Sequence, residues 1–276
     1  MLFRSLVSTS DNFGSRGGRP SHPELLDWLA ARFVADGWSV KAMHRLILLS
    51  ATYQQTSNPK SDVRHPKSVD PDDRLLWRMP RRRLEAEALR DAMLAVAGRL
   101  DRTVGGDETI DVVYRKGEVI DAKRGFVVNT VNGGHPVYAT PRRSIYLPVI
   151  RNALPDVLSL FDAADPNAVA AVRNDSTVPP QALFMLNNPF VREQALHLAQ
   201  SLLADATTDA GRLRSAYERA LGRPPSADEL ADATVFLGEY AARLKAKGRP
   251  EAEARLAAWQ SYCQMLFCTN EFLYVE

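Results

Sequence analysis

The sequence predicts a mainly α-helical protein: a helical bundle-like domain with a small β insert near residues 108–150. Apolar residues recur at spacings of three and four through most of the chain, which is typical of helices with one buried face. Residues 105–134 differ, because short runs of β-branched residues lie between the glycine pairs at 105–106 and 133–134. Such runs, bounded by glycine, indicate short strands joined by turns.

The first part of the chain, residues 1–104, is predicted to be helical, with helices over 22–35, 40–53, 70–77 and 82–100. Ser21 and Glu24 have the spacing of a capping box at the start of the first helix. The second helix is rich in apolar residues, and the burial of each would stabilise the fold by about 1.5–3 kcal/mol. A helix-turn-helix would instead expose a polar recognition helix. The sequence therefore predicts core packing here and no nucleic-acid binding.

The β insert, residues 105–150, is predicted to contain strands over 111–114, 118–121, 125–131 and 144–149. Residues 151–276 return to helical spacing, with helices over 155–161, 179–186 and 189–204 and further helices up to residue 267. Gly222 is expected to end one of them, and Ser226 with Glu229 has the spacing of a second capping box. Short loops between helices are typical of an antiparallel bundle. We treat the three parts as one domain over residues 1–276.

Composition narrows the classes of function. The chain has 276 residues, of which 45% are hydrophobic, and a formal net charge of +2. A charge this small gives the whole molecule no strong attraction to nucleic acid or anionic lipid. No apolar run approaches the ~20 residues that cross a bilayer, so no membrane span is predicted. The N-terminal residues also lack the apolar region of a signal peptide.

The sequence predicts no metal site and no cofactor in this chain. None of the five histidines has a partner at the i, i+4 spacing of a helical metal site. Cys263 and Cys268 are five residues apart on a predicted helix, so they point to different sides of it and are expected to be buried free thiols. The absence of a C-x-x-C-H sequence means that this chain has no c-type haem attachment site.

Seven blocks of the sequence resemble a known family. They are SDNFGSRGGRPSHPELLDWLA, LLWRMPRRRLEAEALRDAML, RRSIYLPVIRN, FDAADPN, NDSTVPPQALFMLNNPFV, ALGRPPSADEL and CTNEFLYV. In this order they are similar to the planctomycete-specific domain of unknown function (domain of unknown function 1553), over nearly the whole chain. The resemblance implies no established activity and no agreed catalytic residues.

The same resemblance implies a setting for the domain. Family members are usually large exported proteins in which this domain follows a cytochrome-c-like module and a second uncharacterised domain. It therefore implies an extracytoplasmic location, an upstream cytochrome-c-like module as a partner, and haem c on the upstream modules of full-length relatives. A tryptophan-containing helix usually precedes the block that matches residues 2–4, so we expect Met1 to lie inside an N-terminally incomplete domain.

Two arginine clusters are candidate sites for an anionic ligand. Arg81, Arg82 and Arg83 are predicted at a helix start, where each exposed cation opposes the helix dipole at a cost of about 0.3–1 kcal/mol. Arg142 and Arg143 lie just before a predicted strand. Guanidinium groups bind planar anions through paired N–H donors. If both clusters face one cleft, the expected ligand is an anionic polysaccharide; the alternative is that acidic residues nearby in the sequence pair with the arginines.

A polar loop and two isolated residues complete the candidate ligand-binding set. The loop contains Asp11, Asn12 and Arg16 and leads to His22 at the first helix, but it lacks the lysine of a phosphate-binding loop. His135 follows a glycine pair, and Asn174 precedes a Ser-Thr-Val-Pro-Pro segment. The glycines of the loop have the alternative role of allowing positive φ. Asn174 has the alternative of a structural role, beside Ser176 or Thr177 as a helix cap.

Three hypotheses about function follow. The first is a binding or scaffolding module of an exported multi-domain protein, linked to polysaccharide use. The second is an enzyme of unknown class, whose cleft is lined by the polar loop, the arginines and His135. The third, a cytoplasmic regulatory protein, is the minor alternative. Substrate, redox role and oligomeric state do not follow from the sequence.

Overall fold

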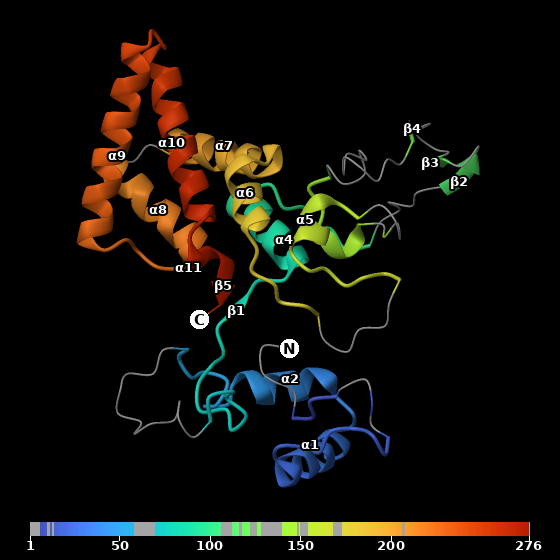
Figure 1. The fold of residues 1–276 in the computed structure, drawn as a ribbon. Coiled ribbons are helices and arrows are strands. Elements are labelled where there is room, and N and C mark those ends of the chain that lie inside the picture. Colours follow the sequence, from blue (N-terminus) through green and yellow to red (C-terminus); the bar gives the residue numbers. More distant parts are fainter. Residues whose placement is uncertain are drawn as a thin grey trace. The chain divides into compact units, whose positions relative to one another are not determined.

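The computed structural model describes residues 6–9, 12, 14–57, 70–105, 112–115, 118–121, 126–127, 140–147, 149, 154–167, 173–205 and 208–275. They are mainly helical with small antiparallel sheets, which confirms the predicted fold class (Figure 1). The chain groups into two compact units. Unit 1 comprises Met1–Arg83, Val169–Val172 and Tyr274–Glu276, and unit 2 comprises Leu84–Ala168 and Arg173–Leu273.

The described residues of unit 1 form two helices that bury none of their residues. They are α1 (Pro23–Ala35) and α2 (Val40–Leu48). The exposed fraction is 53% for Trp28 and 65% for Leu49, which follows α2. The prediction that the second helix packs into a core is therefore wrong, because the described residues of unit 1 supply no further helix to cover it.

The two helices of unit 1 begin differently. The N-cap of α1 is His22, and no side chain caps the helix. Ser21 instead shares a hydrogen bond of 3.0 Å with Nδ1 of His22 and donates to the carbonyl of Leu6, so the predicted capping box at Ser21 is wrong. At α2, Ser39 accepts a hydrogen bond from the backbone N–H of Ala42, as N-cap serines do.

Residues 70–77 form turns and not the predicted helix. The carboxylate of Asp70 accepts hydrogen bonds from the backbone N–H groups of Arg74 and Leu75, at 3.0 and 2.7 Å. Asp73 does the same for Trp77 and has a positive φ of 54°. Aspartate side chains thus bind the N–H groups that a helix would need, and this competition favours turns.

The arginines at 82 and 83 lie in a strand. β1 (Arg82–Arg83) pairs antiparallel with β5 (Tyr274–Val275), and the helix that was predicted from residue 82 begins only at α4 (Ala86–Val96). The N-cap of α4 is Glu85, and Glu87 lies in its first turn. Carboxylates at a helix N-terminus interact favourably with its dipole. The premise that the arginine cluster opposes a helix dipole is therefore wrong.

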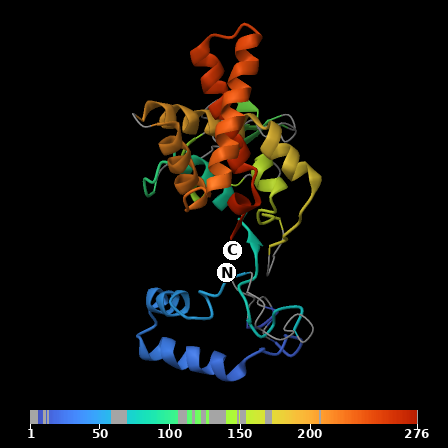
Figure 2. The ribbon, with the colours of Figure 1, turned by 90° about the vertical axis from the view of Figure 1, so that its left-hand side faces the viewer.

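The core of unit 2 surrounds α10 (Glu251–Phe267), which is buried on several sides. It packs against α7 (Pro189–Ala204) and forms a long antiparallel hairpin with α9 (Ala227–Ala246) (Figures 1 and 2). Further contacts with α10 come from three more helices of this unit, α6 (Pro179–Asn187), α8 (Asp209–Leu221) and α11 (Asn270–Leu273). The buried residues of α10 are Ala254, Ala258, Trp259, Tyr262, Cys263, Leu266 and Phe267.

The β insert contributes a small antiparallel sheet. Its strands, in the order β2-β3-β4, are β2 (Val112–Arg115), β3 (Glu118–Asp121) and β4 (Phe126–Val127). Residues 144–146 were predicted to belong to another strand, but Ser144–Tyr146 form a short 3-10 helix, η2. The backbone N–H of Ser144 donates to the carboxylate of Asp91 at 2.8 Å, which takes it away from any strand partner.

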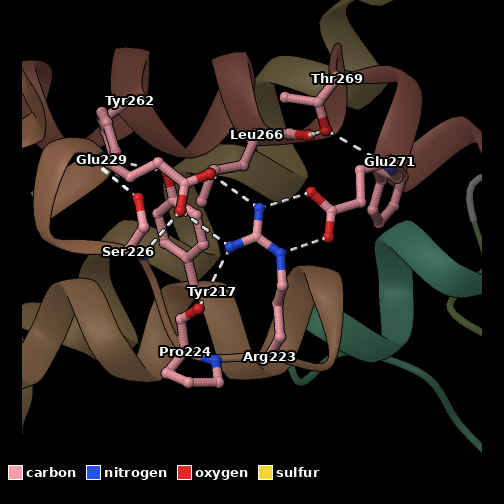
Figure 3. Close-up of polar contacts among 10 residues, drawn as sticks. Tyr217, Arg223, Pro224, Ser226, Glu229, Tyr262, Leu266, Thr269 and Glu271 are labelled. Carbon is pink, nitrogen blue, oxygen red and sulfur yellow. Dashed lines mark hydrogen bonds and ion pairs between the residues drawn. The ribbon is translucent and has the colours of Figure 1, made fainter. Parts of the chain in front are cut away.

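An ion-pair cluster joins the ends of three helices in unit 2 (Figure 3). Gly222 ends α8 with a φ of 73°, which places Arg223 beside the start of α9 and the side of α11. The guanidinium donates to both carboxylate oxygens of Glu229 at 2.7 and 2.8 Å and to both of Glu271 at 2.6 and 2.7 Å. Its Cζ lies 5.4 Å from the centre of the Tyr217 ring. One arginine thereby links the α8–α9 loop to the first turn of α9 and to α11.

The same cluster contains the second predicted capping box, which is confirmed. Ser226 accepts from the N–H of Glu229, and the Glu229 carboxylate accepts from the N–H of Ser226 at 2.7 Å. Hydrogen bonds from Arg223, with further ones from Ser226, lower the pKa of Glu229 to about 2. A carboxyl group with a depressed folded-state pKa stabilises the fold above its ordinary pKa and loses that contribution as pH falls.

We expect Arg223→Gln to lower the free energy of unfolding by about 1–2 kcal/mol at neutral pH, because two charge-assisted forks are lost at a partly exposed site. The difference from the parent protein should shrink as pH falls from the ordinary glutamate value of about 4.3 toward about 2. Urea denaturation at several pH values measures the free energy of unfolding of each protein and its dependence on pH. Arg243→Gln is the matched control, since Arg243 makes one exposed ion pair, with Glu239. A loss of stability in Arg223→Gln that does not change with pH would contradict the role assigned to Glu229.

Candidate functional site

The predicted ligand-binding residues fall in both units. Unit 1 contains Asn12, Arg16, His22, Arg81, Arg82 and Arg83, whereas unit 2 contains Arg142, Arg143 and Asn174. Asp11 and His135 lie outside the described residues. The hypothesis of one cleft that gathers all of them stays a prediction.

The polar loop of unit 1 is a tight turn built on close backbone approach. Gly18 donates its N–H to Oγ1 of Thr9 at 2.7 Å, and Gly17 donates to the carbonyl of Gly14. A Cβ atom on Gly17 would lie 2.4 Å from the carbonyl oxygen of Asn12. The glycine at 17 is therefore required by packing. The side chains of Asn12 and Arg16 are exposed beside this turn.

Other predicted positions have simple surroundings. The Arg81 side chain is exposed, whereas Arg82 and Arg83 are half-buried in the β1–β5 pair. Asn174 is exposed, and the preceding Arg173 pairs with Glu87 at 2.5 Å. These residues stay candidates from the sequence.

The best-defined polar site lies where residues 140–146 cross α4. Arg90 is only 3% exposed, and its guanidinium donates to the carbonyls of Thr140 and Arg142 at 2.5 and 2.9 Å. It also donates to Oγ of Ser144, and that hydroxyl donates to Asp91 at 2.7 Å. A buried arginine and its neighbouring aspartate thus fix a segment that lies more than 50 residues further along the chain.

This segment places Arg142, Arg143 and Tyr146 together, and we call these residues the arginine–tyrosine site. The Cζ atoms of Arg142 and Arg143 lie 4.8 and 5.2 Å from the centre of the Tyr146 ring. Nη2 of Arg143 donates to the Tyr146 hydroxyl at 3.0 Å. Arg142, only 9% exposed, donates to the carbonyls of Thr103 and Gly105. Of the predicted residues in unit 2, the structure brings the two arginines together around one aromatic ring.

The arginine–tyrosine site carries two guanidinium groups, and Asp101, whose backbone bridges to Arg142, interacts with that arginine through space. In the described part of the chain, neither Arg142 nor Arg143 has a carboxylate within ion-pair distance, and the Nε atoms of both are buried without a hydrogen-bond partner. Main-chain carbonyls accept some of the hydrogen bonds that the Arg142 guanidinium donates. Hydrogen bonding from the Gly105 backbone and from Arg143 lowers the pKa of Tyr146. These hydrogen bonds favour the deprotonated form of Tyr146 relative to a tyrosine in water.

Reasoning from the sequence missed the residues that build this site. Arg90, Asp91, Ser144 and Tyr146 were not among the candidates. One signal was present, because Arg90 lies four residues after Ala86 and four before Leu94 on the buried side of α4. A cation on the apolar side of a helix needs buried acceptors. The position of those acceptors, around residue 142, was not visible in the pattern.

No three His, Cys, Asp or Glu side chains gather into a metal-binding group within the described ranges. Both cysteines are free thiols; Cys263 is buried, Cys268 is half-buried, and burial raises the pKa of each. None of the helices in the described residues is long and apolar enough to cross a membrane.

Comparison with known proteins gives one finding. A family model described as PSD1, protein of unknown function (DUF1553), matches residues 1–237. The chain belongs to this family. The match includes every predicted ligand-binding residue and the whole arginine–tyrosine site. No curated protein and no solved structure matches the chain. Membership in DUF1553 therefore comes with no assigned activity.

We expect Arg90→Met to lower the free energy of unfolding by about 3 kcal/mol or more, because several buried acceptors lose their donor at once. Thermal and urea denaturation measure the loss. Arg99→Met is the matched control, since the Arg99 side chain is exposed just after the same helix. Equal stability of the two variants would show that Arg90 does not fix the segment.

Proposed function

We propose that this DUF1553 domain is a binding module that recognises an anionic group, a sulfate or carboxylate on a polysaccharide, at the arginine–tyrosine site. The observation that supports it is the lack of carboxylate partners for Arg142 and Arg143 within the described residues. Surface arginines usually find exposed acidic neighbours, as Arg214 and Arg243 do in this chain. Two adjacent guanidiniums without such neighbours retain a positive potential that an anionic ligand satisfies.

The roles of the three residues differ. Arg142 is buried and bound to main-chain carbonyls, so it contributes positive potential from behind the site. Arg143 is half-buried, and its hydrogen bond to Tyr146 uses one of five N–H donors, which leaves donors for a planar anion. The Tyr146 hydroxyl lies beside those donors and adds a further polar group. Arg90 and Asp91 act through the backbone and position this segment.

The family setting adds one inference that rests on resemblance alone. An exported protein with an upstream cytochrome-c-like module would bring this binding module to extracytoplasmic polysaccharide.

The alternative function is that of an enzyme, because a tyrosine with a lowered pKa beside arginines is a feature of some active sites. Binding is the simpler proposal, since it requires only the charges and donors described above.

We expect the purified protein to bind heparin and polygalacturonate, and Arg143→Gln to weaken that binding by about tenfold or more, because one charge-assisted contact is worth at least ~1.4 kcal/mol. Isothermal titration calorimetry at two salt concentrations measures the affinity, which should fall with added salt. Arg99→Gln, with an exposed side chain, is the control for net charge.

Arg82→Ala tests the separate cluster in unit 1. If only Arg82→Ala weakens binding, the anion site lies in unit 1 and the arginine–tyrosine proposal is wrong. Binding that is equal in the parent protein, Arg143→Gln and Arg99→Gln would also contradict it.

A further inference from the structure

A second site in unit 2 is independent of the arginines. A hollow of about 610 Å³ lies between α5 (Asp156–Leu160) and α6, and we call it the α5–α6 groove. It is lined by Asp156, Ser159, Leu160, Pro180, Leu183, Phe184, Asn187 and Asn188. Its volume falls within the ~300–1,000 Å³ that is typical of small-ligand sites.

A set of buried contacts fixes the positions of the two helices that form the groove. Gln181, 6% exposed, donates from its amide to the carbonyls of Leu160 and Ser176 at 2.9 and 3.1 Å. Ser176 in turn donates to the carboxylate of Asp162 just after α5. Phe184 packs edge-on against the buried ring of Phe161, with ring centres 5.7 Å apart. The two helices therefore keep a fixed separation.

Apolar groups form one part of the groove surface. Leu183 is 58% exposed on α6 beside Phe184 and Pro180, and Leu160 contributes from α5. A leucine exposed beside a half-buried aromatic ring leaves apolar area in contact with water. That area favours a ligand with flat C–H surfaces.

The polar groups at the edge of the groove keep hydrogen-bond acceptors and donors that no contact within the described residues uses. Asn187 uses an amide N–H for the Leu183 carbonyl, which leaves its Oδ1 as an acceptor. Asn188 uses Oδ1 to accept from the N–H of Phe190, which leaves its NH₂ group as a donor. Ser159 donates to the Asp156 carbonyl, so its oxygen remains an acceptor, as does the Asp156 carboxylate.

Among its described lining residues, the groove combines several acceptors and the amide N–H donors of Asn187 and Asn188 around an apolar surface, with no cation. The negative charge of the Asp156 carboxylate disfavours the binding of an anion in the groove. A neutral hydroxyl-bearing ring fits this chemistry, because its hydroxyls donate to carboxylate and amide oxygens and accept from an amide, while its C–H faces pack on Leu183 and Phe184.

We infer that the α5–α6 groove binds a neutral sugar ring of an oligosaccharide. This goes beyond the proposed anion recognition and uses none of the same residues. A second hollow in the described part of unit 2 lies between α8, α9 and α10, at about 280 Å³. Its edge is occupied by the ion pairs Asp209–Arg255 and Lys245–Glu251, so it offers fewer polar groups to a ligand.

The test uses the full chain and four neutral trisaccharides: cellotriose, maltotriose, xylotriose and mannotriose. Titration calorimetry, supported by NMR line broadening of the sugar, measures binding. We expect at least one trisaccharide to bind at millimolar concentration. Leu183→Asp, which places a charge on the apolar surface, should weaken binding by about tenfold or more. Its stability should stay close to that of the parent protein, because Leu183 is largely exposed.

Leu186→Asp is the matched control, since Leu186 is 56% exposed on the same helix but does not line the groove. Asn187→Ala should weaken binding, and Asn187→Asp, which keeps the acceptor oxygen, should restore it. Arg143→Gln should leave neutral-sugar binding unchanged, so failure here and failure of the anion proposal are distinguishable.

Absence of binding for all four trisaccharides would overturn the inference, as would equal binding by Leu183→Asp and Leu186→Asp. Analytical ultracentrifugation adds a further arm. Self-association that Leu183→Asp abolishes would assign the groove to a second copy of the chain, and it would also overturn the sugar proposal.

Discussion

The burial of α10 is the constraint on which the rest of unit 2 depends. Trp259, Leu266 and Phe267 are almost completely removed from solvent, and each stabilises the fold by about 1.5–3 kcal/mol. Ala254 and Ala258 are also buried and let neighbouring helices approach closely. Because α10 is covered on several sides, α7, α8 and α9 have fixed places around it. Surface ion pairs, worth about 0–1 kcal/mol each, adjust this arrangement without determining it.

Buried polar groups then place the functional segments on this bundle. Arg90 binds the carbonyls of residues 140 and 142, and Gln181 binds those of residues 160 and 176. Each buried donor satisfies acceptors that would otherwise lose their hydrogen bonds with water. Such contacts specify one geometry more than they add stability. They give the arginine–tyrosine site and the α5–α6 groove rigid supports.

The two sites complement one another in charge. Among the described residues, the first has two guanidiniums without ion-paired carboxylates, and the second has a carboxylate and amides but no cation. A polysaccharide that carries both charged and neutral units offers groups suited to each. This pairing unites the two proposals, although each has its own test and its own control variants.

Local patterns were reliable where the local sequence decides the structure. The helix predicted over 189–204 is observed as Pro189–Ala204, and the capping box of Ser226 and Glu229 forms as expected. Predictions failed where side chains compete for the backbone. Asp70 binds backbone N–H groups and produces turns, Asp91 binds the N–H of Ser144 and produces η2, and Arg82 pairs with Val275, nearly 200 residues further along the chain.

By itself, the sequence determined the helical class, the small β insert and the positions of most helices in unit 2, because spacing, caps and glycines act over a few residues. It also identified the arginine pair at 142–143. Only the tertiary structure decided what surrounds that pair and how α5 meets α6. Those contacts join residues that are 14 to 54 positions apart in the sequence. Helical spacing and composition therefore do not predict them.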